Sequence, residues 1–351
     1  MKRFIIVLLS IAILLPVTGL AQVVDPAVNR GIRPVRGLAN NPVIEGENQL
    51  TGLPADAPYI PVLVNIDNVQ GAWPQWGIAD ADIIYELPIH GLGLTRLMAL
   101  FAYQHPKAVG PVRSGRVLHA EIREEWDAAW VYFGVQTRTG SNVNDYLRKH
   151  GVRNKPVNLL FDGTGNRYDQ FFSSMKGYVN PHNHSIDLTK VVQEVSAYSF
   201  PQRPFLFTDE LPAAGVDARR IDLKHGADMG SYSNAYFIYD EQTNQYTRYR
   251  NNKLYVDGNQ PDAGLTFANL IVQWTELKFN GKASAPLLKE VGEGNADIFT
   301  GGRYIAGYWV RESVSSRTIF YDDKGEEIRL QRGKTFINLV CDRGTQLSYE
   351  E

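Results

Sequence analysis

GPVRSGRVLHAEIREEW, residues 110–126, marks a change of hydrophobic period in the chain. Upstream of it, residues 96–103 form an apolar run that is typical of a buried strand. Within the quoted segment, Leu118, Ile122 and Trp126 recur every four residues and predict a helix with one apolar face. A buried strand followed by an amphipathic helix is typical of layered α/β proteins, so this segment decides the fold class.

The same interleaving of strand-like and helical segments continues to about residue 200. We therefore expect an N-terminal α/β layered domain with a mixed sheet over residues 53–222. Past Arg219 helical periodicity nearly disappears and short strand-like runs alternate with turn residues, which predicts a mostly antiparallel β domain over residues 223–348. A chain of 351 residues is long enough for two cores. The expected fold class is therefore a two-domain protein that combines α/β and α+β architecture.

The N-terminus has the pattern of a secretory signal peptide, which we expect over residues 1–21. Lys2 and Arg3 precede an apolar run, and small residues follow it where a signal peptidase cuts, which predicts cleavage before Gln22. A membrane anchor is the alternative, but the run is shorter than about 18–20 residues and contains a proline. Residues 22–52 are rich in Pro, Asn, Gly and Val without a period, and we expect a flexible linker there.

Composition excludes several classes of protein. The net charge of −2 comes without a basic stripe, which argues against a nucleic-acid partner. Cys341 is the one cysteine, so no internal disulfide is expected, and its apolar surroundings favour a buried side chain over a nucleophile. Gly292-Glu-Gly294 is expected in a turn rather than at a helix start, which argues against a dinucleotide site. We expect no cofactor, no metal and no transmembrane segment after the signal peptide.

Two cations lie at the start of the predicted helix. Ser114 is the expected N-cap, and no capping box closes from it because the third helical position is Val117. Arg113 and Arg116 therefore place positive charge at the positive end of a helix, which disfavours the helix by itself. Either a protein carboxylate or an anionic ligand compensates them, and both alternatives stay open.

Carboxylates and histidines elsewhere are candidates for the same site. Asp82 and Glu86 lie on one side of the strand that contains them and are able to serve as general acid and base. Alternatively, the aspartate caps a helix and the glutamate pairs with an arginine. In His182-Asn183-His184 two histidines share one side of an extended segment, but without a third ligand nearby a polar loop with one functional histidine is favoured over a metal site.

Short motifs that match a known family are spread along the chain between residues 41 and 335. They are, in order, Asn41-Pro, Leu50-Thr-Gly-Leu-Pro54, Pro74-Gln-x-Gly77, Ala81-Asp-Ile-Ile-Tyr-Glu86, Thr95-Arg96, Gly110-Pro-Val-Arg-Ser-x-Arg116, Pro181-His-Asn183, Gly292-x-Gly294, Gly307-x-Trp309, Tyr321-Asp-x-x-Gly325 and Gly333-Lys-Thr335. Together they resemble the YerB-type family of bacterial envelope lipoproteins, whose biochemical function is unknown. The resemblance implies a two-domain exported protein at the bacterial envelope. Members of that family typically carry a lipobox cysteine after the signal, whereas Leu20-Ala-Gln22 has none, so we expect a secreted, periplasmic or envelope-associated protein.

Three hypotheses of function follow. The first is an envelope binding or accessory protein whose N-terminal domain holds an anionic ligand, such as a cell-wall glycan or peptide. The residues expected to bind the ligand are Glu86, Arg96, Arg113, Ser114, Arg116, His182 and Asn183. The second is a cell-wall hydrolase or lyase in which Glu86 or Asp82 and His182 transfer protons. The third is a module that docks another envelope protein through aromatic side chains of the β domain.

Overall fold

The structure, a computed structural model, describes residues 21–26, 41–90, 93–226, 233–278 and 285–351. All of the predicted signal peptide except Ala21 lies outside these residues, as do residues 27–40 of the predicted linker. Across the described segments, no helix is both long enough and apolar enough to cross a membrane.

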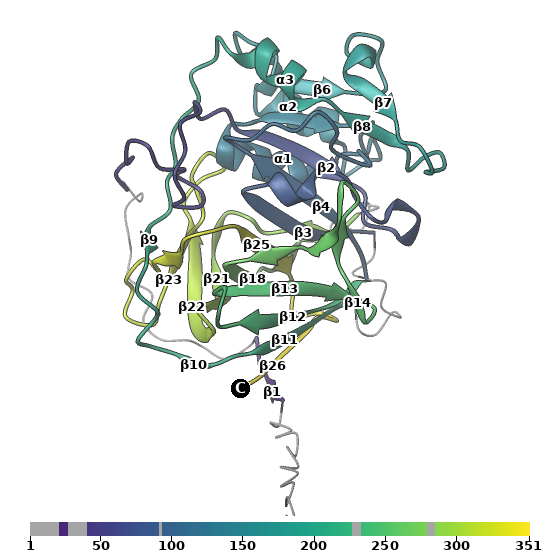
Figure 1. The fold of residues 1–351 in the computed structure, drawn as a ribbon. Coiled ribbons are helices and arrows are strands. Elements are labelled where there is room, and N and C mark those ends of the chain that lie inside the picture. Colours follow the sequence, from purple (N-terminus) through teal and green to yellow (C-terminus); the bar gives the residue numbers. More distant parts are fainter. Residues whose placement is uncertain (1–20, 27–40, 91–92, 227–232, 279–284) are drawn as a thin grey trace, which may run out of the picture.

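One large mixed sheet forms the middle of the molecule (Figure 1). Its strands, in spatial order, are β10 (Val216–Asp217), β22 (Arg303–Arg311), β21 (Gly292–Thr300), β18 (Asn269–Trp274), β25 (Thr335–Val340), β3 (Ile83–His90), β4 (Leu94–Phe101), β2 (Val62–Ile66), β5 (Ala129–Tyr132) and β6 (Leu160–Asp162), with β23 (Ile319–Tyr321) beside β22. The pairs β18–β25, β25–β3, β2–β5 and β5–β6 are parallel, and the others are antiparallel.

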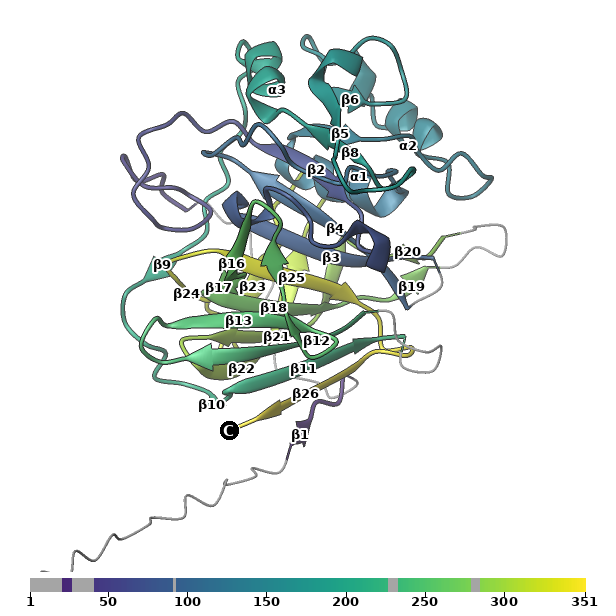
Figure 2. The same ribbon diagram turned by 45° about the vertical axis from the view of Figure 1, so that its right-hand side comes forward.

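A second, antiparallel sheet packs under the C-terminal half of the first (Figure 2). It contains β1 (Gln22–Val23), β26 (Gln346–Glu350), β11 (Arg220–His225), β12 (Ser233–Asp240), β13 (Gln245–Arg250), β14 (Lys253–Leu254) and β17 (Thr266–Phe267). Four two-stranded ladders complete the strands of the described residues: β15 (Val256–Asp257) with β16 (Gln260–Gly264), β19 (Leu277–Lys278) with β20 (Leu287–Leu288), β24 (Leu330–Gln331) with β9 (Phe207–Thr208), and β7 (Phe172–Ser174) with β8 (His184–Ile186).

Helices cover both faces of the N-terminal part of the large sheet (Figure 1). They are α1 (Val117–Trp126), α2 (Val143–Lys149) and α3 (Leu188–Val195), and short 3₁₀ turns form η1 (Gln70–Ala72), η2 (Ile78–Asp80), η3 (Val152–Asn154) and η4 (Asp169–Phe171). Because side chains alternate along a strand, each strand supplies two cores. Val64 of β2 joins the core that contains α3 and the second sheet, whereas Leu63 joins the core under α1 and α2.

The expected fold class is confirmed: an N-terminal layered part with helices and a mixed sheet precedes a C-terminal part made mostly of antiparallel strands. Both parts contribute strands to the large sheet, since the late strand β25 lies between β18 and β3. The expected boundary between residues 222 and 223 falls inside β11, which starts at Arg220.

Part of the predicted flexible linker is packed structure. Residues 48–52 are almost entirely buried, and Leu50 has no exposed surface. The Asn48 side-chain amide donates to Asp82 at 2.6 Å, and the Thr51 carbonyl accepts the Gly333 N–H at 2.7 Å. The prediction of a linker up to residue 52 was wrong here because turn-forming residues build packed turns as readily as free linkers.

Candidate functional site

Asp67 is the centre of a buried ionic cluster at the end of β2. The strand is apolar except for Asn65, and the Asp67 carboxylate that follows it has no exposed surface. One carboxylate oxygen accepts the Asn68 N–H at 2.9 Å and lies 3.4 Å from Nη2 of Arg96. The other lies 3.3 Å from Nε of Arg113 and 2.6 Å from Nδ1 of His182.

Four separate segments bring these groups together. Arg96 is on β4, the antiparallel neighbour of β2. Arg113 lies on the segment between β4 and α1, and its backbone N–H donates to the Asn65 carbonyl of β2 at 3.0 Å. His182 precedes β8, and the His184 carbonyl accepts the Val112 N–H at 2.7 Å. Since the parallel strands β2 and β5 end at the same edge, the cluster lies beyond the carboxyl ends of strands, where layered α/β folds usually bind ligands.

Positive charge is in excess in this cluster. Arg96, Arg113 and Arg116 gather here, and Asp67 is the one carboxylate of the described residues that forms ion pairs with any of them. Burial, reinforced by the other two guanidinium groups, lowers the pKa of Arg96 to about 10 despite Asp67. Burial and Arg113 also lower the pKa of Arg116. An additional anion would stabilise these charges.

Only some of the guanidinium N–H groups of the cluster form hydrogen bonds within the described part of the protein. Arg96 donates from Nη1 to the Ser114 carbonyl at 2.8 Å, and Arg116 donates from Nη1 to the Gly115 carbonyl at 3.0 Å. The Nε atoms of Arg96 and Arg116 are buried and have no hydrogen-bond partner. Ser114 contributes through its backbone carbonyl, which accepts from Arg96 and, at 3.4 Å, from Arg116. The side chains of Arg113 and His182 are 24% and 28% exposed, which leaves the cluster accessible from solvent.

Helix α1 starts two residues later than expected, with Arg116 rather than Ser114 as its N-cap. The Arg116 N–H donates to Nδ1 of His119 at 2.9 Å, so the third helical residue does close one half of a capping box. Burial, with Arg96 and Arg116 beside it, holds the pKa of His119 well below its usual value. The ring is therefore neutral and able to accept this bond.

Of the two other loop residues, Asn183 follows His182 directly in the chain, and burial together with nearby Arg113 lowers the pKa of His184. The Asn183 carbonyl accepts the Met175 N–H at 2.8 Å, and its side-chain oxygen is buried with no partner. His184 stacks on Phe133 at 4.2 Å between ring centroids. Within the described residues no group of three histidines, cysteines or carboxylates is placed to hold a metal.

Glu86 lies outside the cluster, although it was expected among the ligand-binding residues, and it pairs with an arginine as the alternative interpretation predicted. Its Oε2 pairs with Nη2 of Arg248 on β13 at 2.6 Å, and its Oε1 accepts from Thr95 at 2.6 Å and from the Asn68 amide at 3.1 Å. Burial acts to raise the pKa of Glu86, but Arg248, with smaller contributions from His225 and Arg250, lowers it. Arg250, which donates to the Asn68 side chain, lines a cavity of about 390 Å³ beside this second network.

Strand alternation explains the separation of the two networks. Glu86 shares a face of the sheet with Ile84, in the core toward the second sheet, whereas Arg96 shares a face with Met98, toward α1. Glu86 and Arg96 are thus close in the β3–β4 ladder, where Leu87 pairs with Arg96, but they point to opposite faces. Asp67 and Asn68 diverge in the same way and link the two networks across the sheet.

Asp82 belongs to neither the arginine cluster nor the Glu86 network. It accepts hydrogen bonds from the Asn48 amide at 2.6 Å and the Ala102 N–H at 2.7 Å, and burial raises its pKa to about 6. The structure therefore brings together Arg96, Arg113, Arg116 and His182, with Asn183 next to His182 in the chain, and it places Glu86 and Asp82 outside that group. The carboxylate that pairs with His182 is Asp67, which sequence reasoning missed; a single aspartate at the end of an otherwise apolar strand was the available signal.

Comparison with known proteins identifies the family. Residues 50–200 match the N-terminal domain of DUF3048, and residues 226–337 match its C-terminal domain, both described as protein of unknown function. The chain belongs to the DUF3048 family. A protein of Bacillus subtilis (strain 168) named "Putative lipoprotein YerB" is 27% identical over 316 residues, which are 84% of this DUF3048 chain and 86% of that protein. The crystal structure of YerB from Bacillus subtilis, 21% identical, superposes with a TM-score of 0.72 over 86% of this chain and 99% of the other, so the two share a fold.

Proposed function

We propose that this DUF3048 protein is a binding protein of the bacterial envelope that holds an anionic group of its ligand at the cluster of Arg96, Arg113 and Arg116. The observation that carries the proposal is the gathering of three guanidinium groups around one buried carboxylate. A carboxylate or phosphate group fits because it accepts paired hydrogen bonds from a guanidinium. Cell-wall glycans and peptides carry such groups.

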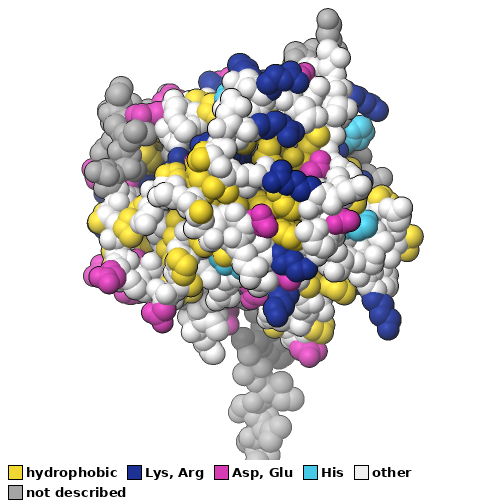
Figure 3. Space-filling view, turned by 90° about the horizontal axis from the view of Figure 1, so that it is seen from above, with side chains coloured by type: hydrophobic (Ala, Val, Ile, Leu, Met, Phe, Trp, Pro, Cys, Tyr) yellow, Lys and Arg dark blue, Asp and Glu magenta, His cyan; other side chains and the backbone are white. Residues whose placement is uncertain are grey.

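The setting of the cluster supports binding over a purely structural role. Beyond Asp67, no anion in the described residues balances the cluster, and the N-terminus of α1 adds positive potential at the same place. Viewed from the end that carries α2 and α3, Lys and Arg side chains gather across the surface (Figure 3). The envelope location rests on the predicted signal peptide and on the lipoprotein name of the relative.

Thermal unfolding in added inorganic phosphate tests the proposal. We expect phosphate to raise the Tm of the wild type and of Arg138→Gln, a control at an exposed arginine. The double variant Arg113→Gln, Arg116→Gln should lose this response. If the double variant is strongly destabilised while neither phosphate nor acetate ever raises the Tm of the wild type, the cluster is structural and the proposal is wrong.

A hydrolase is the second candidate, because Asp67 and His182 form a close pair. The 2.6 Å contact occupies Nδ1 of the ring, which orients the imidazole and leaves Nε2 to take a proton from water. This candidate replaces Glu86 and Asp82 by Asp67 as the partner of His182. The aromatic docking surface has less support, because no tyrosine or tryptophan in the described part of residues 225–348 is exposed.

Hydrolysis of p-nitrophenyl phosphate and p-nitrophenyl acetate distinguishes the two candidates. A hydrolase should release p-nitrophenol faster than buffer alone, and His182→Gln should abolish turnover while the Tm shift by phosphate persists. If the wild type shows no turnover, the hydrolase is excluded for these ester classes and the binding protein stands.

A further inference from the structure

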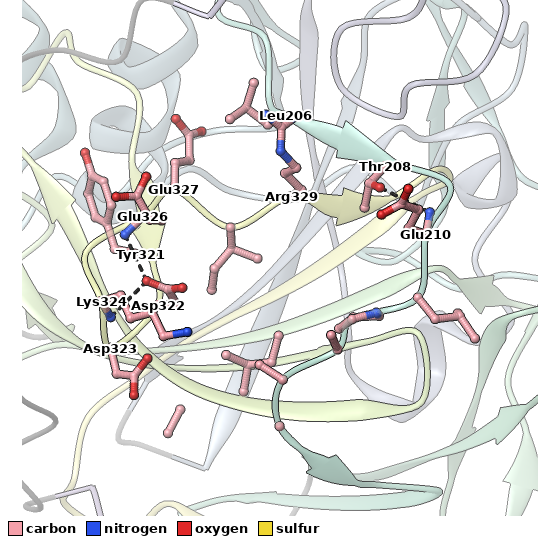
Figure 4. Close-up of a pocket in the computed structure, with 18 residues that line it drawn as sticks. Leu206, Thr208, Glu210, Tyr321, Asp322, Asp323, Lys324, Glu326, Glu327 and Arg329 are labelled. Atoms are coloured by element: carbon pink, nitrogen blue, oxygen red, sulfur yellow. Dashed lines mark hydrogen bonds between the residues drawn. The ribbon is translucent and has the colours of Figure 1, made fainter.

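A groove separate from the arginine cluster lies between residues 206–215 and residues 321–329 (Figure 4). Its volume is about 910 Å³, near the upper end of the range of about 300–1,000 Å³ that ligand pockets span. The walls are formed by β9 and the segment after it, by β22, and by the loop between β23 and β24. Large enough for a short piece of peptide, the groove has no role in the proposed anion binding.

Apolar side chains make up a large part of the lining of the groove. They are Leu206, Leu211, Pro212, Ala213, Ala214, Ile305, Ala306 and Ile328. Leu211 is 60% exposed, one of the most exposed large apolar side chains of the described residues. An occupant with aliphatic side chains would bury this surface.

Carboxylates outnumber cations among the charged residues of the lining. They are Glu210, Asp322, Asp323, Glu326 and Glu327, against two cations, Lys324 and Arg329. Figure 4 shows the acidic residues of the 321–327 loop at one end and Glu210 at the other. The groove thus combines apolar side chains with acidic side chains at two ends, and a partner with both cationic and aliphatic side chains complements it.

Some of these carboxylates form hydrogen bonds or ion pairs within the protein, and others are exposed without an ion pair in the described residues. Asp322 accepts the N–H groups of Lys324 and Glu326 at 3.0 and 2.9 Å and so shapes the loop. Glu327 pairs with Arg317 at 2.6 Å. Glu210 and Asp323 are exposed, and neither forms an ion pair within the described part of the chain.

We propose that this groove binds an extended segment of another protein in which Lys or Arg alternates with aliphatic residues. In an extended segment successive side chains point to opposite sides, so aliphatic side chains are able to contact the apolar part of the lining while the cationic ones between them turn toward the carboxylates. The exposed carboxylates Glu210 and Asp323 are the contacts that a cation gains without breaking an existing pair.

Fluorescence anisotropy with the full chain tests the proposal, with a labelled hexapeptide of alternating Arg and Ile as the probe. We expect saturable binding that weakens with salt. The double variant Glu210→Gln, Asp323→Asn should weaken it about tenfold, and Leu211→Ser should weaken it independently of salt. The double variant Glu194→Gln, Asp262→Asn, at exposed carboxylates outside the groove, should bind as the wild type does.

Three outcomes would overturn the proposal. The first is unchanged affinity in the Glu210→Gln, Asp323→Asn variant, and the second is equal binding of a peptide of alternating Glu and Ile. The third concerns a peptide with the sequence of residues 27–40, which contains Arg30, Arg33 and Arg36; if only that peptide binds, the occupant is this chain and not a partner. Binding by Arg113→Gln, Arg116→Gln should persist, so that failure here is distinct from failure of the anion site.

Discussion

At the residue scale, Glu86 and Arg248 form a buried ion pair in the second network. Both side chains are at least 99% buried and lie 2.6 Å apart. Breaking such a pair from one side leaves an uncompensated charge in the core, whereas replacing both partners by neutral residues does not. The pair lies on the face of the sheet opposite to the arginine cluster, so stability and anion binding should respond separately.

We expect Glu86→Gln to lower the free energy of unfolding by about 3–5 kcal/mol because Arg248 loses its counter-charge. Adding Arg248→Met should recover most of that loss. Urea denaturation measures both effects, and the phosphate-dependent rise in Tm should remain as in the wild type. Loss of the phosphate response in Glu86→Gln would contradict the assignment of the two networks to opposite faces.

Because Asp82 is buried, we expect the free energy of unfolding to depend on pH. Burial raises its pKa from 3.8 to about 6, so the folded state binds this proton more tightly than the unfolded chain does. The resulting stabilisation is fully present below a pH of about 4 and is lost as the pH rises through about 6, a change of at most about 3 kcal/mol. Urea denaturation across this window should show that Asp82→Asn lacks this component of the decline.

The matched control for this measurement is Asp145→Asn, which removes an exposed carboxylate paired with Arg148. It should keep the pH profile of the wild type. An identical profile in Asp82→Asn and the wild type would mean that Asp82 does not hold its proton in this range.

The clearest prediction of individual site residues came from a conflict with a local rule. Arg113 and Arg116 were noticeable because cations disfavour a helix start. Their true partner was not predictable, because choosing between Glu86 and Asp67 requires the register of β3 and β4 and the face to which each strand residue points. Asp67 conflicted with no local rule, since polar residues commonly end strands.

At the element scale, hydrophobic period located β4 and helix α1, and its errors have physical causes. Gly292-Glu-Gly294 was expected in a turn but starts β21. A Cβ on Gly294 would lie 2.5 Å from the Trp274 carbonyl and from Nε1 of Trp309. The glycine therefore permits close packing within a strand, a function that sequence pattern does not separate from turn formation.

The N-terminus of α1 provides a test at the same scale. His119→Ala removes the acceptor of the Arg116 N–H, and we expect a loss of at least about 1–2 kcal/mol in the free energy of unfolding. His119→Gln keeps an acceptor at the third helical position and should lose less. Chemical denaturation compares the two variants, and equal losses would show that packing of the ring, not the capping bond, stabilises this helix start.

At the scale of the whole molecule, the two family domains share one sheet. Their difference in composition was readable in the sequence, because helical period fades after Arg219. The pairing of β25 with β3 was not, since a parallel contact between residues about 250 positions apart leaves no local trace. Domain boundaries drawn from local pattern therefore divide a single hydrogen-bonded sheet.

This pairing predicts that the N-terminal part does not fold alone. A fragment of residues 41–222 lacks β25 and exposes the edge of β3, whose side chains are buried except at His90. We expect no cooperative thermal transition from this fragment by circular dichroism, and recovery when residues 223–351 are added. A cooperative transition in the isolated fragment would show that its own core suffices.

The position of β25 between β18 and β3 also limits the order in which the large sheet can assemble during synthesis. A ribosome makes the chain from the N-terminus, so β3 and β18 both exist before the strand that must lie between them. Until residues 335–340 emerge, two apolar strands present open edges, which readily pair with wrong partners. Biogenesis of this protein should therefore depend on a holding factor that shields those edges until synthesis is nearly complete.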